Sequence, residues 1–521
     1  MSTEVVPDPT EPIEPTEPTE VPSAREIRQE IRDWRRGRAE LKWGEALSDA
    51  YVGLFCVVMI GAMAGNVVLN LRQLADETCT GSCGEVRSAA PWLVALAVAL
   101  LALGMSRLLG PVFSPPASNS WVLSSPVDRG GLLRPGWLRT TALTAVGAAL
   151  LLVAPAVLSG FAWHEAVVYL VAGSATALAC VGVAALSQVH EDPISRWLTW
   201  LVTVVLWVVL GLSATHELER LPAVSPSLVL AVAVAMAVVA VLLAWRSATA
   251  VGKVSRRVLG QTEHLSPSLS GALSSVDLGL MYDVLLARRW GRGAHVRSHT
   301  GGPLGWGALV HRDFRRALRT PQPYVLLAGL VLVPYAAAEA DAGRAVVLAT
   351  TFAGVLGGPA LCVGLRVVVR TQGLARMMPF RRQRLLLAHL VVPGAALMLF
   401  ALATTPTLVD EVSGGGAVNL AIACGLSSIA ATVRWITGKP PNYAAPMVST
   451  PAGGAPTGII FSVLRGFDVW AITALPLMFG QGGMLFSTII SIGVIAFLTS
   501  DGIQQPPQQP ARQPSGKPTI R

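Results

Sequence analysis

Apolar runs long enough to cross a lipid bilayer recur along the whole chain, separated by shorter polar segments. A helix needs about 20 apolar residues to span the hydrocarbon core. Six candidate segments lie near 49–71, 90–113, 140–161, 165–187, 196–214 and 226–246. Six more lie near 323–338, 344–369, 385–404, 414–433, 467–480 and 483–500. The pattern predicts an all-α fold: a polytopic membrane protein with about 12 transmembrane helices.

Composition and charge agree with this prediction. Of the 521 residues, 52% are hydrophobic and only 14% are charged, whereas soluble domains carry about 25% charged residues. The net charge is +9, which also occurs in proteins that bind nucleic acid. Loop arginines that orient membrane spans explain it better, because twelve spans place nearly all Lys and Arg on one side. We therefore expect a multi-pass protein of the cytoplasmic membrane with both termini cytoplasmic and no nucleic-acid partner. The basic residues left on the outer side or at its border are Arg72, Arg87, Arg220 and Arg344.

The two ends of the chain differ in composition from the apolar part. Residues 1–24 are rich in Pro, Glu and Thr and contain no base, which predicts a disordered acidic cytoplasmic tail and no cleavable signal. Residues 501–521 are expected to form a disordered tail rich in Pro and Gln. Between them we expect a first six-span half at 25–246, a cytoplasmic linker at 247–308 and a second six-span half at 309–500.

Two short strings recur at equivalent places and indicate an internal repeat. Residues 32–36 read Arg-Asp-Trp-Arg-Arg and residues 312–316 read Arg-Asp-Phe-Arg-Arg, each just before the first span of its series. Between the second and third spans, residues 126–133 share Pro, Arg, Leu and Leu with residues 379–386. The first pair of strings is 280 residues apart and the second pair is 253 residues apart. The long outer loop at 72–89 accounts for much of this 27-residue difference. We expect two parallel six-helix repeats.

The first repeated string lies on a basic amphipathic stretch. Residues 25–43, and their counterpart at 309–319, can each form a helix that lies in the inner headgroup layer in contact with membrane lipid. The alternative is an ordinary basic flank of a span. The residues expected on these elbow helices are Arg32, Asp33, Trp34, Arg35, Arg312, Asp313, Phe314 and Arg315.

The second repeated string lies on an inner loop, residues 114–139, whose counterpart at 371–386 is more basic. Pro126 suits the first turn of a short helix, and polar tips between apolar anchors are typical of a docking element for a cytoplasmic partner. A loop that merely joins two spans is the alternative. The residues expected to form the docking loops are Pro126, Asp128, Arg129, Leu132, Leu133, Pro379, Arg381, Arg382, Leu385 and Leu386.

With an amphipathic elbow before the first span, six spans per half and these inner loops, residues 25–500 resemble permeases of ATP-binding-cassette exporters. In that group the permease and the ATPase are usually separate chains. The resemblance implies that the docking loops are coupling helices for two copies of an ATPase subunit, which would hold ATP and Mg. It also implies outward transport, and the scarcity of polar groups in the spans favours an apolar or amphipathic cargo.

The catalytic motifs of other classes are missing from the sequence. No Gly-Lys pair completes a phosphate-binding loop, since Lys253, Lys439 and Lys517 are followed by Val, Pro and Pro. We therefore expect a transport subunit that is not an enzyme and holds no cofactor. No His-Glu-x-x-His string indicates a membrane metalloprotease. The His residues considered, at 164, 190, 216, 295, 299 and 311, are expected to be interfacial or linker residues.

A twelve-span secondary transporter, driven by an ion gradient, remains the alternative. Asp128 to Gly131 fits the middle of the loop motif of the major facilitator group. Ser124, Leu132 and Leu133 depart from it, and the spans offer few carboxylates to bind a coupling proton.

Two smaller features complete the prediction. Cys79 and Cys83 lie in a polar loop, where a disulfide is favoured over a zinc pair because no other Cys or His is near. Arg107 and Arg366 lie near the inner ends of the second spans, where we expect them to extend to the headgroups, or else to line an inward cavity.

Overall fold

The computed structural model describes the helical parts of the chain and leaves out the placement of the rest. Described are residues 23–37, scattered positions between 51 and 76, and residues 82–112, 118–125, 127–213, 215, 226–263, 302–340, 342–409, 416–438, 447–450, 453–456 and 465–500. Nearly all of both predicted tails, about half of the first predicted span, Pro126 and most of the predicted linker lie outside these ranges.

Within the described ranges, nine helices are long and apolar enough to cross a membrane, and a bent pair makes up to ten. The chain is therefore a polytopic membrane protein. In the first half these helices are α3 (Ser82–Leu109), α4 (Arg129–Leu158), α5 (Trp163–His190), α6 (Ile194–Ser213) and α7 (Pro226–Ala250). In the second half they are α12 (Gln322–Leu330) with α13 (Leu332–Glu339), α14 (Ala345–Leu361) with α15 (Val363–Arg370), α17 (Arg382–Ala403), α18 (Gly416–Thr437) and α21 (Gln481–Thr499). The shorter apolar helix α20 (Phe467–Ala474) continues into a 3-10 turn, η5 (Leu475–Phe479).

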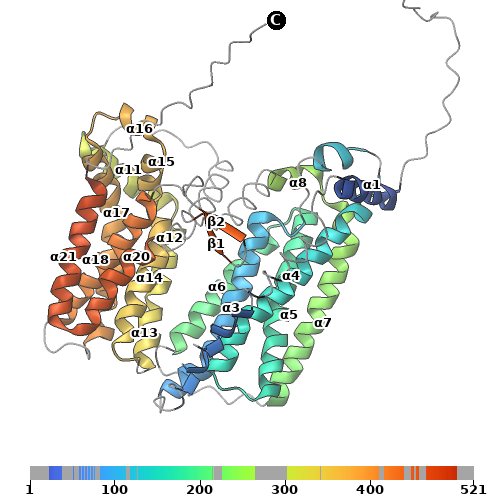
Figure 1. Ribbon diagram of the computed structural model, residues 1–521, viewed down its shortest axis with the longest axis horizontal. Helices are drawn as coiled ribbons and strands as arrows, with labels where there is room; N and C mark the ends of the chain where they lie inside the picture. Colours follow the sequence, from blue (N-terminus) through green and yellow to red (C-terminus); the bar gives the residue numbers. More distant parts are fainter. Residues whose placement is uncertain are drawn as a thin grey trace, which may run out of the picture.

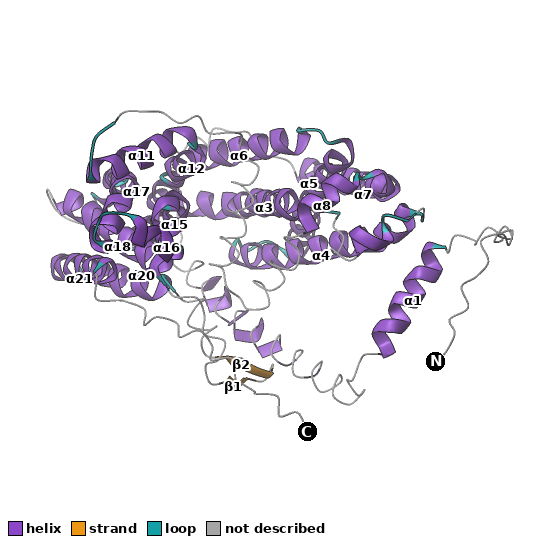
Figure 2. Ribbon diagram, turned by 90° about the horizontal axis from the view of Figure 1, so that it is seen from above, coloured by secondary structure: helices purple, strands orange, loops and turns teal. Residues whose placement is uncertain are grey.

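The long helices run up and down between two ends of the molecule (Figure 1). One end carries the short helices α1 (Ala24–Gly37), α8 (Arg256–Glu263), α11 (Trp306–Arg319) and α16 (Gln372–Met377). The π-helical turn η1 (Ser118–Val122) precedes α4 at the same end. We call this the basic end. The view from above places α3 to α7 on one side and α12 to α21 on the other (Figure 2).

In the first half, α5 lies at the centre and packs against α3, α4, α6 and α7. Small residues on α5 allow close approach, which is how membrane helices commonly associate. A side chain at Gly173 would overlap Leu152 of α4, and one at Gly182 would overlap Leu243 of α7. Tyr169 is buried and donates a hydrogen bond to the carbonyl of Pro91 in α3 at 2.7 Å.

In the second half, α18 takes the central place and packs against α14, α17, α20 and α21. Gly354 and Gly358, four residues apart on α14, face Ser428 and Thr432 of α18 so closely that a methyl group would overlap them. This Gly-x3-Gly spacing lets two backbones approach. The Ser428 hydroxyl donates to the Thr351 carbonyl at 3.2 Å, which adds a polar link between the same helices.

Two predicted spans are interrupted. The span predicted at 323–338 breaks at Val331, just before Pro334, whose ring nitrogen cannot donate to the helix. The span predicted at 344–369 bends by 62° at Cys362, three residues after Pro359 within α14.

The halves meet where α13 packs against α3 and α6. Close by, the Trp207 ring of α6 lies on Gly329 of α12, where a Cβ atom would come within 2.3 Å of the indole. The strands β1 (Met447–Thr450) and β2 (Gly453–Pro456) form a short antiparallel ladder with Met447 opposite Pro456. Every other element in the described ranges is helical.

Candidate functional site

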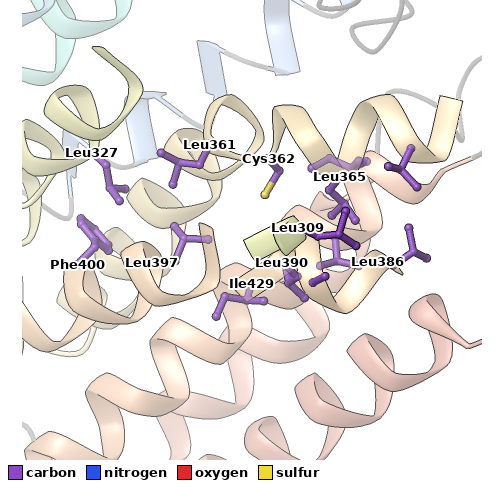
Figure 3. Packing of buried hydrophobic residues seen from close by; sticks show 14 of the residues in the cluster. Leu309, Leu327, Leu361, Cys362, Leu365, Leu386, Leu390, Leu397, Phe400 and Ile429 are labelled. Atoms are coloured by element: carbon purple, nitrogen blue, oxygen red, sulfur yellow. The ribbon is translucent and has the colours of Figure 1, made fainter. Parts of the chain in front are cut away.

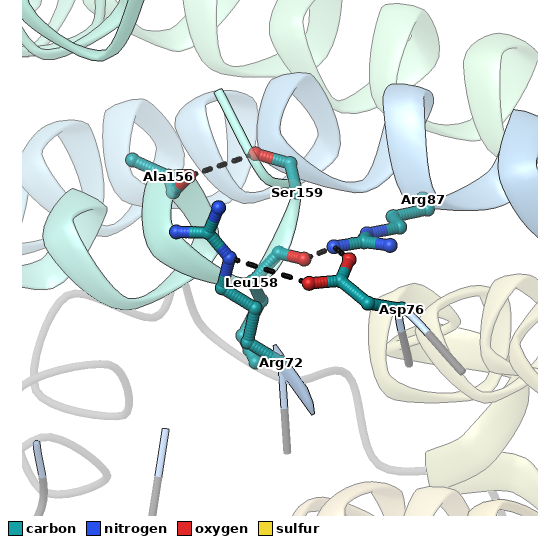
Figure 4. Close-up of polar contacts among 6 residues, drawn as sticks. All are labelled: Arg72, Asp76, Arg87, Ala156, Leu158 and Ser159. Carbon is teal, nitrogen blue, oxygen red and sulfur yellow. Dashed lines mark hydrogen bonds and ion pairs between the residues drawn. The ribbon is translucent and has the colours of Figure 1, made fainter. Parts of the chain in front are cut away.

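Arginines gather at the basic end, whereas the opposite end shows few. On the opposite side Arg87 donates to the Leu158 carbonyl at 2.8 Å and pairs with Asp76, which also pairs with Arg72 (Figure 4). These contacts fasten the start of α3 to the end of α4. The asymmetry matches the positive-inside pattern. Arginines at the helix ends and short helices of the basic end include Arg25, Arg28, Arg32, Arg129, Arg257, Arg312, Arg319, Arg376, Arg381 and Arg382.

The third span of the first half begins inside the predicted docking loop. Both carboxylate oxygens of Asp128 accept backbone N–H bonds at 2.9 Å, from Gly130 and Gly131. This capping starts α4 at Arg129, so residues 129–139 are helix, and their prediction as a loop is wrong. Asp128 therefore serves the helix start, and Leu133 is buried in the core of the half.

The third span of the second half begins at the equivalent residue. Arg382 is the first residue of α17, as Arg129 is of α4. Leu385 and Leu386 are completely buried, so they anchor the helix while Arg381 stays exposed. Arg129 and Arg382, which the second repeated string aligns, are thus each the first residue of a long helix.

The second elbow helix, α11, is held by a buried polar network. Asp313 is only 6% exposed. The His389 Nδ1–H of α17 donates to Asp313 Oδ2 at 2.5 Å, and Arg316 pairs with Oδ1 at 3.0 Å. We call these three residues the Asp313 network. On the same helix, Leu309 packs in a cluster with Leu365, Leu386 and Leu390 (Figure 3).

Helix α15 closes over the Asp313 network. A Cβ atom at Gly364 would lie within 2.7 Å of Arg316 and Asp313 and 2.8 Å of His389. Only glycine therefore fits there. Trp306 at the start of α11 donates its indole N–H to the Arg384 carbonyl at 3.1 Å. The elbow, the bent span and α17 thus form one packed unit, beside a cavity of about 20 Å³ that has room for a single water molecule.

The first elbow helix, α1, is attached much more loosely. Ser23 and Glu26 form a capping box, with N–H···O distances of 3.3 and 2.9 Å. Within α1 only Ala24 is buried among the described side chains, against Gly131 of α4. Asp33, the counterpart of Asp313, is exposed. Both elbows are helical as predicted. The side chains of Trp34 and Arg35 lie outside the described set.

Other predicted residues are placed as follows. Arg107 is exposed and donates to the Thr199 hydroxyl at 3.2 Å. Arg366 is 1% exposed, so the prediction that it extends to the headgroups is wrong, because the bend at Cys362 turns α15 into the protein. Cys79 and the side chain of Cys83 lie outside the described residues. Across the described ranges no group of three His, Cys, Asp or Glu is arranged to hold a metal.

His389 is the functional candidate that the sequence analysis missed. It lies 76 residues from Asp313, so no local spacing connects them. Its Nε2 is buried and has no hydrogen-bond partner within the described part of the chain. The available signal was an ionisable residue inside an otherwise apolar span, which is costly and often functional in a membrane.

These features define a polytopic membrane protein of two helical halves with an arginine-rich end. Residues 83–446, which include α3 to α18 and so parts of both halves, match the model of a family of unknown function, DUF6297. The chain belongs to this family. A search of curated proteins finds no match.

Proposed function

We propose that the chain is the transmembrane subunit of an ATP-driven exporter, with two fused six-span halves and separate ATPase subunits that dock at the basic end. In this proposal the basic end faces the cytoplasm and both termini lie there. The cargo is apolar or amphipathic, because polar groups are scarce in the spans. ATP and Mg are held by the partner.

The observation that carries the proposal is a repeated packing scheme. The helices that correspond to spans two to six are α3 to α7 in the first half and α14, α17, α18, α20 and α21 in the second. Each packed pair in the first half has its counterpart in the second: α3·α5 and α14·α18, α5·α7 and α18·α21, α3·α6 and α14·α20. Such agreement supports a duplicated unit whose copies have the same orientation.

The docking loops support the proposal through their position. In each half a short helical segment, η1 or α16, comes before the third span, and Arg129 or Arg382 opens that span. In each half the elbow packs against the same span, as α1 on α4 and α11 on α17. A partner that binds both arginines would contact the first residue of the third span in each half, α4 and α17.

The first experiment identifies the partner. Purification of the tagged full chain in mild detergent should yield a stoichiometric protein with Gly-x4-Gly-Lys-[Ser/Thr], at about two copies per chain, by mass spectrometry. The charge reversals Arg129→Glu and Arg382→Glu, made together, should abolish co-purification of this partner. The membrane subunit itself should keep its elution profile. The matched control, Arg319→Glu on the exposed end of α11, should retain it. A double variant that keeps both the partner and coupled ATP hydrolysis contradicts the docking assignment.

One observation favours a secondary transporter as the second candidate. The Asp313 network offers a buried carboxylate and imidazole about 10 Å along α17 from its start, which is a composition suited to binding a coupling proton. A chain that purifies alone, and whose transport in vesicles follows an imposed pH gradient and is lost in Asp313→Asn, would establish this candidate.

A further inference from the structure

A cavity of about 590 Å³ lies at the basic end of the first half, between α1, η1 and the first turns of α4. It falls within the volume range of small-molecule sites in proteins. The loose attachment of α1 creates it, because the helix touches α4 mainly through Ala24 and Gly131 and leaves the remaining space open.

The cavity combines an apolar floor with a cationic rim. Leu123 and Leu133 are buried at its base. Arg28, Arg32 and Arg139 also line it, and no Asp or Glu is among the lining residues. The acidic residues of α1 thus lie elsewhere on that helix. An occupant with a negative group above an apolar body would match this arrangement.

The apolar surface continues from the cavity down α4. Leu143 lines the cavity and is 74% exposed, and Val146 and Leu150 are also exposed. With Arg139 they follow the spacing i, i+4, i+7 and i+11, which places them on one helix face. Because α4 is a membrane-spanning helix, this face offers a path for a hydrocarbon chain directly below the arginines.

At the equivalent place in the second half, the Asp313 network joins the elbow to the span. Position 136 is the eighth residue of α4 and His389 is the eighth residue of α17. His389 reaches Asp313 and holds α11 against the span. The first half has Gly136 there, which lines the cavity, and a Cβ atom on it would meet nothing within 4 Å. Because Gly136 has no side chain, the space beside α4 stays open, and this position gives the first elbow no link like that of His389.

We propose that this cavity binds an anionic phospholipid from the membrane leaflet at the basic end. Arg32 and Arg139, with Arg28, hold the phosphate. One acyl chain enters the cavity and the other follows the exposed face of α4 through Leu143. The proposal does not depend on the ATPase partner.

The test uses the full-length protein in mixed detergent micelles that contain equal amounts of phosphatidylglycerol and phosphatidylcholine. Native mass spectrometry counts the lipids that each chain retains. We expect at least one bound phosphatidylglycerol per chain and a preference of five-fold or more over phosphatidylcholine. Arg32→Gln with Arg139→Gln should abolish the preference, and Gly136→Phe should lower retention several-fold because the ring enters the space proposed for the acyl chain.

Two controls separate the site from general effects. Gly211→Phe also adds a ring at a helical glycine with open space around it, on α6. Arg312→Gln with Arg319→Gln removes two exposed charges from the other elbow. Both should retain lipid as the unaltered chain does. Unchanged retention in Gly136→Phe overturns the proposal and indicates that another part of the chain covers the cavity. Inorganic phosphate that displaces the lipid at millimolar concentration would also overturn it, by reducing the site to an anion site.

Discussion

Removal of the Asp313 carboxylate should release the second elbow helix from the bundle. Asp313 is the point where α11 bonds to α17 through His389 and to its own next turn through Arg316. The substitution Asp313→Ala removes both bonds at once. It also leaves the His389 ring buried without the acceptor that it has in the intact chain.

The size of the effect follows from the burial of each partner. A hydrogen bond to a charged group contributes about 1.5–3 kcal/mol, and both Asp313 and His389 are buried. Arg316 lies on α11 itself, so its ion pair with Asp313 does not tie that helix to the bundle and is left out of the sum. Leaving the imidazole without a partner adds about 1 kcal/mol. The free energy of holding α11 on the bundle should fall by at least about 2.5 kcal/mol, which is roughly 60-fold in the equilibrium for its release.

Hydrogen exchange of the α11 backbone amides measures this equilibrium directly. In detergent, α11 amides should exchange at least roughly 60-fold faster in Asp313→Ala, while amides of α5 keep their rates. The double variant Asp313→Ala with His389→Leu should recover part of the loss, because it removes the unpaired imidazole. Arg312→Gln, an exposed change on the same helix, is the control. Equal exchange in Asp313→Ala and Arg312→Gln would refute the reasoning.

Three further substitutions test the packing. Gly364→Ala should lower the melting temperature and speed α11 exchange, since its methyl group overlaps the Asp313 network; unchanged exchange contradicts that contact. Gly329→Leu should weaken the junction of the halves by displacing Trp207, seen as a lower melting temperature than in Gly493→Leu, where space is open. Asp128→Ala should destabilise the start of α4 by about 1 kcal/mol, measured as faster exchange of its first turn, and Asp128→Asn should restore it.

The sequence predicted the spans well because membrane burial acts on long apolar runs that can be read residue by residue. The nine candidate spans and the bent pair of the described residues fall on predicted apolar segments, and the predicted eleventh span is a shorter apolar helix, Phe467–Phe479. The start of the third span was missed by eleven residues, at 140 instead of 129. The polar residues Arg134 and Arg139 concealed the helix there, because the end of a spanning helix that reaches the headgroup layer can be as polar as a loop.

The candidate site was only partly predictable. The repeated strings aligned Arg129 with Arg382, and each of these residues begins a long helix; the duplication itself stays a prediction. The bond between His389 and Asp313 depends on how α11 crosses α17, and no residue pattern within either helix encodes that crossing. The cavity beside α1 was invisible for the same reason: it is a space between three separate elements.

The two elbow helices are attached to the bundle differently, and His389 and Gly136 account for part of the difference. With His389 on α17, the second elbow is bonded to the span, because release would break the buried hydrogen bond between His389 and Asp313. With Gly136 at the equivalent place, the first elbow meets α4 mainly through one small contact and can separate from it at little cost. A displacement at Arg382 is therefore transmitted to its elbow directly. In the proposed lipid complex, the occupant of the cavity would add a second link between α4 and α1, beside the contact of Ala24 with Gly131.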